Sequence, residues 1–430
     1  MVTNNIDYTQ FEISNYILKI TGVFNYDSKF AQKALNSGYT NLFFSENEEK
    51  FNKDYFYSDL RKQFFSNDEK RHEILINKNY KNSKISLSKF DKKQILKIIN
   101  TRLDLFDDGF GLFTINLEID SDTILLSQFS DATYLIRNFE SEVDDYKYVY
   151  WHQYIENEIL LGISTRGESI RVDDYSGSKY KLFVVLDIPE AKEQEIISNL
   201  LFDFGTISKI GSANSNTYDS MDKKYIELLI KNNSINIYNN WKGLALLDTF
   251  TVVGKNVLDK DYKLETFSSI YHSIYLYCLF VKYNLFKFNY EIADLDEDKR
   301  TQFQEFLTKY YYNYISYNFL PTEIFNKIKN ALDIDKELKI INEKIDLVGL
   351  QIQEAQQERT NKILGIVTVL SSLSSAQPVY DYLLIGQKYL GWDVALYWTV
   401  TVTLTLIIAS GIGFYVFGNK ILKWINNRKK

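Results

Sequence analysis

The chain has little of what would let it form disulfides or bind nucleic acid over a broad surface. Its 430 residues include one cysteine, Cys278, and only three prolines. A single thiol cannot form an internal disulfide, so the fold suits a reducing compartment. The formal net charge of −6 argues against a broad basic face, and we therefore expect no nucleic-acid partner.

Common signatures of catalysis are also missing. The three histidines lie far apart in the sequence, and no Cys/His pair has the spacing of metal ligands. The chain has no Walker-type phosphate loop, and Gly109-Phe110-Gly111 lacks the third glycine of a dinucleotide fingerprint. The sequence therefore predicts a protein that is not an enzyme, with no catalytic or metal residue assigned.

Long apolar runs, in contrast, occur twice toward the C-terminal end. Residues 394–417 carry no charge and exceed the about 20 helical residues that cross a hydrocarbon core, so we predict a transmembrane helix there. Residues 363–385 include Asp381 and several serines, and hydropathy alone leaves two alternatives for them. They form a first transmembrane helix, or they lie along the membrane interface.

The basic tail, and the even number of membrane crossings that two cytoplasmic ends require, favour two transmembrane helices. Residues 418–430 form a basic tail with five Lys or Arg side chains, which the positive-inside rule places in the cytoplasm. The amino end shows no basic leader followed by an apolar run, so we expect the large N-terminal part in the cytoplasm as well. Two spans joined by an outer loop at 386–393 satisfy both conditions. The sequence thus predicts a multi-pass protein of the inner (plasma) membrane with N- and C-termini cytoplasmic.

The residues before the spans predict a mixed α/β cytoplasmic domain over 1–263, which we interpret as a sensor domain. Runs rich in branched and aromatic residues indicate strands, and apolar residues at helical spacing indicate helices between them. Strands are predicted at Gly111–Ile119, Lys179–Ile188, Ser234–Tyr238 and Ala245–Val253, and helices at Lys89–Leu103, Ile124–Phe139 and Glu190–Leu201. This alternation predicts a sheet with helical cover.

Residues 264–321 predict a helical part of the same domain. The apolar stretch Thr266–Phe288 is long enough for a third span, but its histidine and two lysines favour a buried helix that packs on the sheet. A second helix is expected over Asp296–Phe319. It should end before Pro321, because the residue that precedes a proline disfavours the helical conformation.

Residues 322–362 predict a long stalk helix. Over four heptads every seam position is apolar: Ala331, Leu338, Ile345 and Ile352 at a, and Ile334, Ile341, Val348 and Ala355 at d. Sustained heptads are typical of a coiled coil. The alternative is an amphipathic helix that packs on its own domain. The pattern reaches the first span without a helix breaker, so we expect one continuous helix that identical copies would accompany.

A stripe of small and polar residues runs along this predicted first span. Its members are Asn361, Gly365, Thr368, Ser371, Ser372 and Ser375. Small residues let membrane helices approach closely, so the stripe could be a packing seam. Around a shared axis the same stripe would line a pore. We favour the pore, because the heptads already bring copies around an axis. A hydrophobic gate would then lie at Leu364, Val367 and Leu370.

This layout resembles the CorA-like family of two-span divalent-cation transporters. The stretches that carry the likeness are Tyr271–Phe288, Phe303–Pro321, the stalk end ERTNKILGIVTVLSSL and Pro378, so that it covers about Asn233–Lys430. The resemblance implies an α+β/α membrane protein with a mixed α/β cytoplasmic domain, a coiled-coil stalk helix and two C-terminal transmembrane helices. It also implies a homopentamer in a lipid bilayer, with the first span lining the pore.

One departure separates the chain from the magnesium transporters of that family. Their Gly-Met-Asn motif corresponds here to Gly386-Gln387-Lys388, at the outer mouth of the pore. In a pentamer each Lys388 would cost a divalent ion about 0.8 kcal/mol at ~10 Å in water, before screening by salt. The departure favours a branch of the family that serves as membrane effectors in type III CRISPR antiviral defence. The resemblance implies gating by a nucleotide second messenger such as an S-adenosylmethionine–AMP conjugate.

Other interpretations stay open at this point. Within the same architecture, the alternative is a transporter for magnesium or another divalent ion. An alternative of another class is a non-conducting, membrane-anchored sensor or scaffold. No residue set identifies a ligand pocket, and the aromatic or basic candidates for a nucleotide are Trp151, Arg166, Arg171 and Trp241.

Overall fold

The computed structural model divides into two compact units, Met1–Ile341 and Asn342–Lys430. The described residues are 8–67, 73–107, 109–145, 147–165, 179–214, 221–291, 297–374, 376–391, 393, 395–396, 398–400, 402–403 and 407. The basic tail and most of the second predicted span therefore lie outside the described residues.

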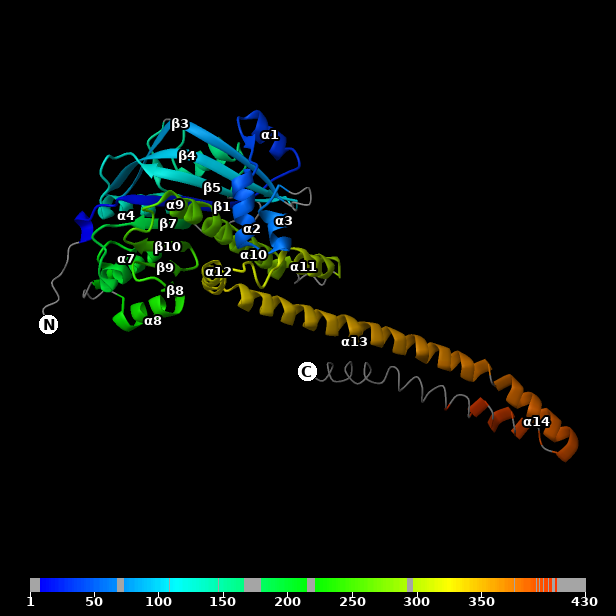
Figure 1. Cartoon of the computed structure of the whole chain (residues 1–430). Coiled ribbons are helices and arrows are strands. Elements are labelled where there is room, and N and C mark those ends of the chain that lie inside the picture. Colours follow the sequence, from blue (N-terminus) through cyan, green and yellow to red (C-terminus); the bar gives the residue numbers. More distant parts are fainter. Residues whose placement is uncertain are drawn as a thin grey trace. The chain divides into compact units, whose positions relative to one another are not determined.

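The first unit is built around one mixed ten-stranded sheet (Figure 1). Its strands are β1 (Asn15–Asn25), β2 (Thr40–Asn41), β3 (Glu73–Lys89), β4 (Lys92–Phe106), β5 (Phe110–Ile119), β6 (Glu142–Val143), β7 (Lys181–Asp187), β8 (Ser234–Ile235), β9 (Trp241–Ala245) and β10 (Thr249–Gly254). The strand order is β2-β3-β4-β5-β1-β7-β10-β9-β8, and β6 pairs with β3. Strands β7 and β10 run parallel, whereas the other described pairs are antiparallel.

The sequence predicted part of this sheet correctly. The strand expected at Gly111–Ile119 is β5, and the one expected at Lys179–Ile188 is β7. The run at Ala245–Val253 was wrongly taken as one strand, because it holds the end of β9, a turn and most of β10. The strand expected at Ser234–Tyr238 is shorter, since β8 ends at Ile235.

The helix expected at Lys89–Leu103 was wrong. Lys89 ends β3, and the residues from Lys92 onward form β4, which pairs with β3 on one side and with β5 on the other. The stretch contains branched residues with alternating burial, such as buried Ile98 beside half-buried Ile99. Such residues pack well on a pleated sheet, and pairing on both sides outweighs the local helical spacing.

Helices cover both faces of the sheet. The first unit contains α1 (Phe30–Asn36), α2 (Glu46–Tyr55), α3 (Ser58–Phe64), α4 (Leu126–Arg137), α5 (Trp151–Tyr154), α7 (Gln194–Thr206), α8 (Lys223–Asn233), α9 (Asp261–Glu265), α10 (His272–Glu291), α11 (Glu297–Tyr310) and α12 (Phe319–Ala331). On one face Phe129 of α4 packs edge to face on Tyr16 of β1 and on Phe204 of α7, with ring centroids 5.2 and 5.7 Å apart. The helices expected at Ile124–Phe139 and Glu190–Leu201 are these two helices, α4 and α7.

The opposite face carries α10, which confirms the prediction of a buried helix within Thr266–Phe288. Its Phe280 lies 4.3 Å from Phe106, and its Tyr283 stacks on Phe110 at 3.9 Å between ring centroids. The first part of the predicted stretch is a π-helix, η4 (Thr266–Tyr271), which leads directly into α10. A π-helix is rare and occurs frequently at functional sites.

The prediction that one helix continues almost to Pro321 was wrong. Helix α11 ends at Tyr310, and Pro321 lies in the first turn of α12, where the missing N–H is tolerated. The residues between the two helices have tertiary partners instead of helical ones. The backbone N–H of Tyr57 donates to the carbonyl of Ile315, and that of Tyr312 donates to the hydroxyl of Tyr277.

The predicted stalk is interrupted near its start. Helix α12 ends at Ala331, Asp333 adopts a left-handed φ of 53°, and α13 (Ile334–Ser374) begins immediately afterwards. The expectation of one helix from residue 322 was therefore wrong. Helix α13 nevertheless has 41 residues, which corresponds to about 60 Å at 1.5 Å per residue.

The heptad seam is partly explained by packing within the first unit. Ile334 and Ile341 are fully buried there, and Glu337 between them contacts Lys282 and Asn289 of α10. For this first part of α13, the alternative of a helix that packs on its own domain is correct. Further along, Ala355 is exposed, and the coiled-coil prediction remains a prediction there.

Helix α14 (Ala376–Leu390) follows α13 in the second unit. It continues through the first residues of the predicted outer loop 386–393 and ends beside Gly391, whose φ is 72°. Among the residues that the structure describes, no helix combines the length and the apolarity needed to cross a bilayer.

Candidate ligand pocket and predicted pore helix

A pocket of about 340 Å³ lies in the first unit, at the end of the sheet where β10 finishes. We call it the edge pocket. Its walls come from α2, the segment between β8 and β9, the first residue of β9, the segment between β10 and α9, helix α9, η4 and the start of α12. Ligand pockets typically measure about 300–1,000 Å³ and, in α/β sheets, lie beyond the carboxyl ends of the strands. A second cavity of about 230 Å³, beside Phe280 and Phe306, falls below this range.

The lining of the edge pocket is mainly aromatic. Seven of its thirteen residues carry rings: Phe51, Tyr55, Tyr238, Trp241, Tyr262, Phe267 and Tyr271. The rings of Tyr238 and Trp241 lie 5.3 Å apart at 33°, and Phe267 meets Trp241 edge to face at 5.7 Å. These contacts hold the rings in fixed orientations, so the wall is largely formed before any ligand arrives.

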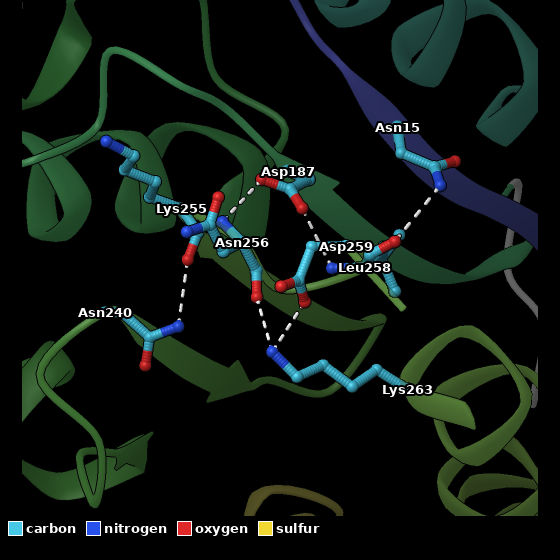
Figure 2. A network of polar contacts seen from close by, with 8 residues as sticks. All are labelled: Asn15, Asp187, Asn240, Lys255, Asn256, Leu258, Asp259 and Lys263. Carbon is cyan, nitrogen blue, oxygen red and sulfur yellow. Dashed lines mark hydrogen bonds and ion pairs between the residues drawn. The ribbon is translucent and has the colours of Figure 1, made fainter. Parts of the chain in front are cut away.

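Asp187, the last residue of β7, fixes the loop that borders the pocket (Figure 2). Its buried carboxylate accepts hydrogen bonds from the backbone N–H of Asn256 at 2.7 Å and of Leu258 at 2.9 Å. The side-chain amide of Asn15 on β1 donates to the Leu258 carbonyl from the other side, at 3.4 Å. Because β7 and β10 are parallel, their carboxyl ends meet at this edge, and Asp187 ties the chain that leaves β10 to the sheet.

Lys263 supplies the charged group of the edge pocket. Its ammonium donates to the Asn256 carbonyl at 2.9 Å and pairs with Asp259 at 2.6 Å. The two charged side chains are 28% and 34% exposed, so water screens the pair. The hydrogen bond from Lys263 is the main reason that the pKa of Asp259 is lowered.

Asn240 and Trp241 are held close to the end of β10. The side-chain amide of Asn240 donates to the Lys255 carbonyl, and the N–H of Lys255 donates to the Asn240 carbonyl, both at 2.8 Å. Gly254 allows this approach: a Cβ there would lie 2.3 Å from the Asn240 carbonyl oxygen and 2.4 Å from the Trp241 Cβ. The pocket wall therefore requires glycine at position 254.

Three tyrosine hydroxyls approach one another inside the pocket. Burial raises the pKa of Tyr55 and of Tyr271, and the neighbouring Tyr238 adds to the rise in both. With raised pKa values, the Tyr55 and Tyr271 phenols stay protonated at pH 7, so each can donate and accept a hydrogen bond. The pocket thus offers neutral polar groups between aromatic walls.

Of the candidates for a nucleotide that the structure describes, Trp241 lines this pocket and Trp151 does not. Trp151 is fully buried, and its indole N–H donates to the Ile136 carbonyl at 2.9 Å, so this side chain packs in the core and does not line the pocket. Arg166 and Arg171 lie outside the described residues.

The predicted pore stripe lies mainly on α13. Asn361, Thr368 and Ser371 are exposed, whereas Gly365 is buried. The Thr368 hydroxyl donates to the Leu364 carbonyl one turn earlier, at 2.7 Å. Ser372 also belongs to α13, and Ser375 lies outside the described residues.

The predicted gate and outer mouth fall on the same two helices. Leu364, Val367 and Leu370 on α13 are 57%, 52% and 60% exposed in the single chain. Gly386, Gln387 and Lys388 belong to the last turns of α14, and the side chain of Lys388 is exposed. The pore role of these residues stays a prediction.

No protein-family model, curated protein or solved structure matches the chain.

Proposed function

We propose that this chain is an oligomeric membrane channel with the plan of the CorA-like family, in which a cytoplasmic domain senses a small ligand. The single observation that carries the proposal is the surface of α13 after Lys362. Ile363, Leu364, Ile366, Val367 and Leu370 are all more than half exposed in the single chain. A continuous apolar surface of this kind marks contact with lipid or with other protein.

The polar stripe supports a pore more than a simple anchor. Asn361, Thr368 and Ser371 bring amide and hydroxyl groups to a helix that is otherwise apolar. An anchor helix needs no polar stripe, whereas a ring of such groups around an axis can replace part of the water around an ion. The hydroxyl bond from Thr368 to the Leu364 carbonyl also keeps that group paired inside an apolar environment.

The edge pocket supports ligand control of the channel. Its size and its aromatic and polar lining are those of a small-molecule site. Three of its residues belong to η4, which continues as α10 and so connects the pocket to the helical part of the domain. We assign this ligand the role of opening or closing the pore, as in the defence effectors that the sequence resembles.

Lys388 argues against magnesium as the conducted ion. In a pentamer, five ammonium groups at ~10 Å would oppose a divalent ion by roughly 4 kcal/mol in water before screening. A Debye length of about 8 Å reduces this to one or two kcal/mol. Transport of magnesium or another divalent ion is therefore the second candidate within the same architecture.

Reconstitution tests the proposal. The purified protein should form pentamers by light scattering and conduct ions in planar bilayers. The double variant Thr368→Leu/Ser372→Leu should lose conduction, because it removes two hydroxyls from the pore wall. The matched control is Thr399→Leu/Thr403→Leu, which removes two hydroxyls from the second predicted span and should retain conduction. Conduction that survives Thr368→Leu/Ser372→Leu would refute the pore role of the stripe. A pentamer that never conducts would show that the spans only anchor the domain, and a silent monomer would end the proposal.

A further inference from the structure

The aromatic walls of the edge pocket are suited to a flat ring. Trp241 is 7% exposed and fixed by its neighbours, whereas Tyr238 and Tyr262 are 46% and 58% exposed. The pocket therefore has a rigid aromatic floor and two tyrosines at the surface that can close over a bound ring. Planar rings stack favourably on aromatic side chains in such sites.

Neutral polar groups inside the pocket can orient the ring. The Tyr55, Tyr238 and Tyr271 hydroxyls and the Thr266 hydroxyl lie among the aromatic side chains. The Thr266 hydroxyl already donates to the Tyr262 carbonyl, at 2.7 Å, and so retains only acceptor capacity. A ring with its own donors and acceptors would find partners that a hydrocarbon ring would leave unused.

Lys263 can exchange its present partner for a ligand. Figure 2 shows its ammonium between the Asn256 carbonyl and the Asp259 carboxylate. Partly exposed ion pairs contribute little to stability, so releasing Asp259 costs little. An anionic group on a ligand in the pocket could then pair with Lys263 in a less exposed setting, where the same attraction is stronger.

We propose that the edge pocket binds a planar aromatic molecule that carries an anionic group, with the ring against Trp241 and Tyr238 and the anion at Lys263. The inference deepens the proposed ligand control and depends on it only for its physiological role. Two sources share this chemistry: a nucleotide and an aromatic carboxylic acid. The π-helix η4 would respond first, because Thr266, Phe267 and Tyr271 all line the pocket.

Two matched pairs of probes test the assignment on the full-length protein in detergent. Indole-3-acetate is compared with indole-3-acetamide, and adenosine monophosphate with adenosine, by isothermal titration. In each pair that binds, the anionic member should bind at least about fivefold more tightly. Binding of the adenine pair alone identifies a nucleotide site, and binding of the indole pair alone identifies a site for aromatic carboxylic acids.

Three variants test which side chains bind the ring and the anionic group of the probes. Lys263→Gln should abolish the preference for the anion and leave binding of the neutral member unchanged. Lys255→Gln is the matched control and should keep the preference, because Figure 2 shows the Lys255 ammonium directed away from Lys263. Tyr262→Ala should weaken both members of a pair, and the exposure of this side chain lets the domain fold without it. An unchanged melting temperature verifies folding in each case.

Two results would overturn the assignment of the edge pocket. Absence of binding by all four probes, or an anion preference that survives in Lys263→Gln, would exclude it. Protein that binds the anionic probes yet stays silent in bilayers would refute the channel and leave the pocket assignment intact. Protein that conducts and binds none of the probes would refute the pocket assignment alone.

Discussion

Replacement of Lys19 by methionine should stabilise the protein, and more so at low pH. Lys19 lies on β1 beneath η4, and its ammonium donates to the Ser268 carbonyl at 2.7 Å. Burial, followed by the nearby Arg102 guanidinium, lowers the pKa of Lys19 to about 7 against the attraction of Asp104. Below pH 7 the folded protein therefore holds a charged amine in a poorly solvated place.

The size of the effect follows from the two pKa values. A shift from 10.5 to about 7 corresponds to roughly 5 kcal/mol of lost unfolding free energy below pH 7. Between pH 7 and 10.5 the unfolded chain binds the extra proton, so the unfolding free energy rises with pH and the loss shrinks. At pH 8.5 the remaining loss is about 3 kcal/mol. Lys19→Met should thus gain about 2 kcal/mol more at pH 6 than at pH 8.5.

Two other effects do not change the difference in stabilisation between pH 6 and pH 8.5. The lost hydrogen bond to Ser268 costs about the same at both pH values and cancels in the comparison. Burial, the largest cause of the lowered pKa of His272, persists in the variant together with the smaller effect of Arg102, so the pKa of His272 stays lowered after Lys19 is replaced. The pH dependence therefore reports on the Lys19 ammonium.

Urea unfolding followed by tryptophan fluorescence, at pH 6.0 and pH 8.5, measures the effect. Lys53→Met on α2 is the control, since Lys53 is exposed and should show the same small change at both pH values. An equal gain at the two pH values, or a larger one at pH 8.5, would refute the reasoning.

Three other substitutions test the fold. Gly254→Ala should lower the unfolding free energy by about 1–3 kcal/mol and weaken binding of the aromatic probes, because the new Cβ meets backbone atoms of Asn240 and Trp241. Ile341→Ala should cost about 2–5 kcal/mol, whereas the same change at the 37% exposed neighbour Ile340 should cost far less; equal losses would contradict the described packing of α13. Trp151→Phe should cost about 1–3 kcal/mol in urea unfolding by leaving the Ile136 carbonyl without its donor, and a neutral result would contradict this role.

The sequence predicted elements whose side chains follow one clear period. The apolar run of β7 and the amphipathic α4 were both correct, because burial on a sheet and local spacing favour the same structure. Strand β4 was mistaken for a helix because its pairing on both sides is a tertiary effect. The same holds for Pro321, since tertiary hydrogen bonds to the residues before it decide where α12 begins.

The edge pocket could not be predicted in this way. Its walls join residues as distant in the sequence as Phe51 and Leu320. From sequence alone, each of its aromatic side chains is indistinguishable from a core residue, in a chain with 33 tyrosines and 29 phenylalanines. Trp241 was singled out only as one aromatic residue among several candidates. Gly254 was missed, although a glycine that ends a branched strand often marks a close backbone approach.

The pocket and the predicted pore helix differ in the kind of argument that supports them. The pocket depends on contacts formed within one chain, so a monomer in detergent should already bind a ligand there. The polar stripe on α13 can line a pore only when several copies surround an axis, because a single helix does not enclose a channel. Binding should therefore survive dilution to the monomer, while conduction should vanish with the oligomer. Loss of both at the same protein concentration would mean that the pocket also requires assembly.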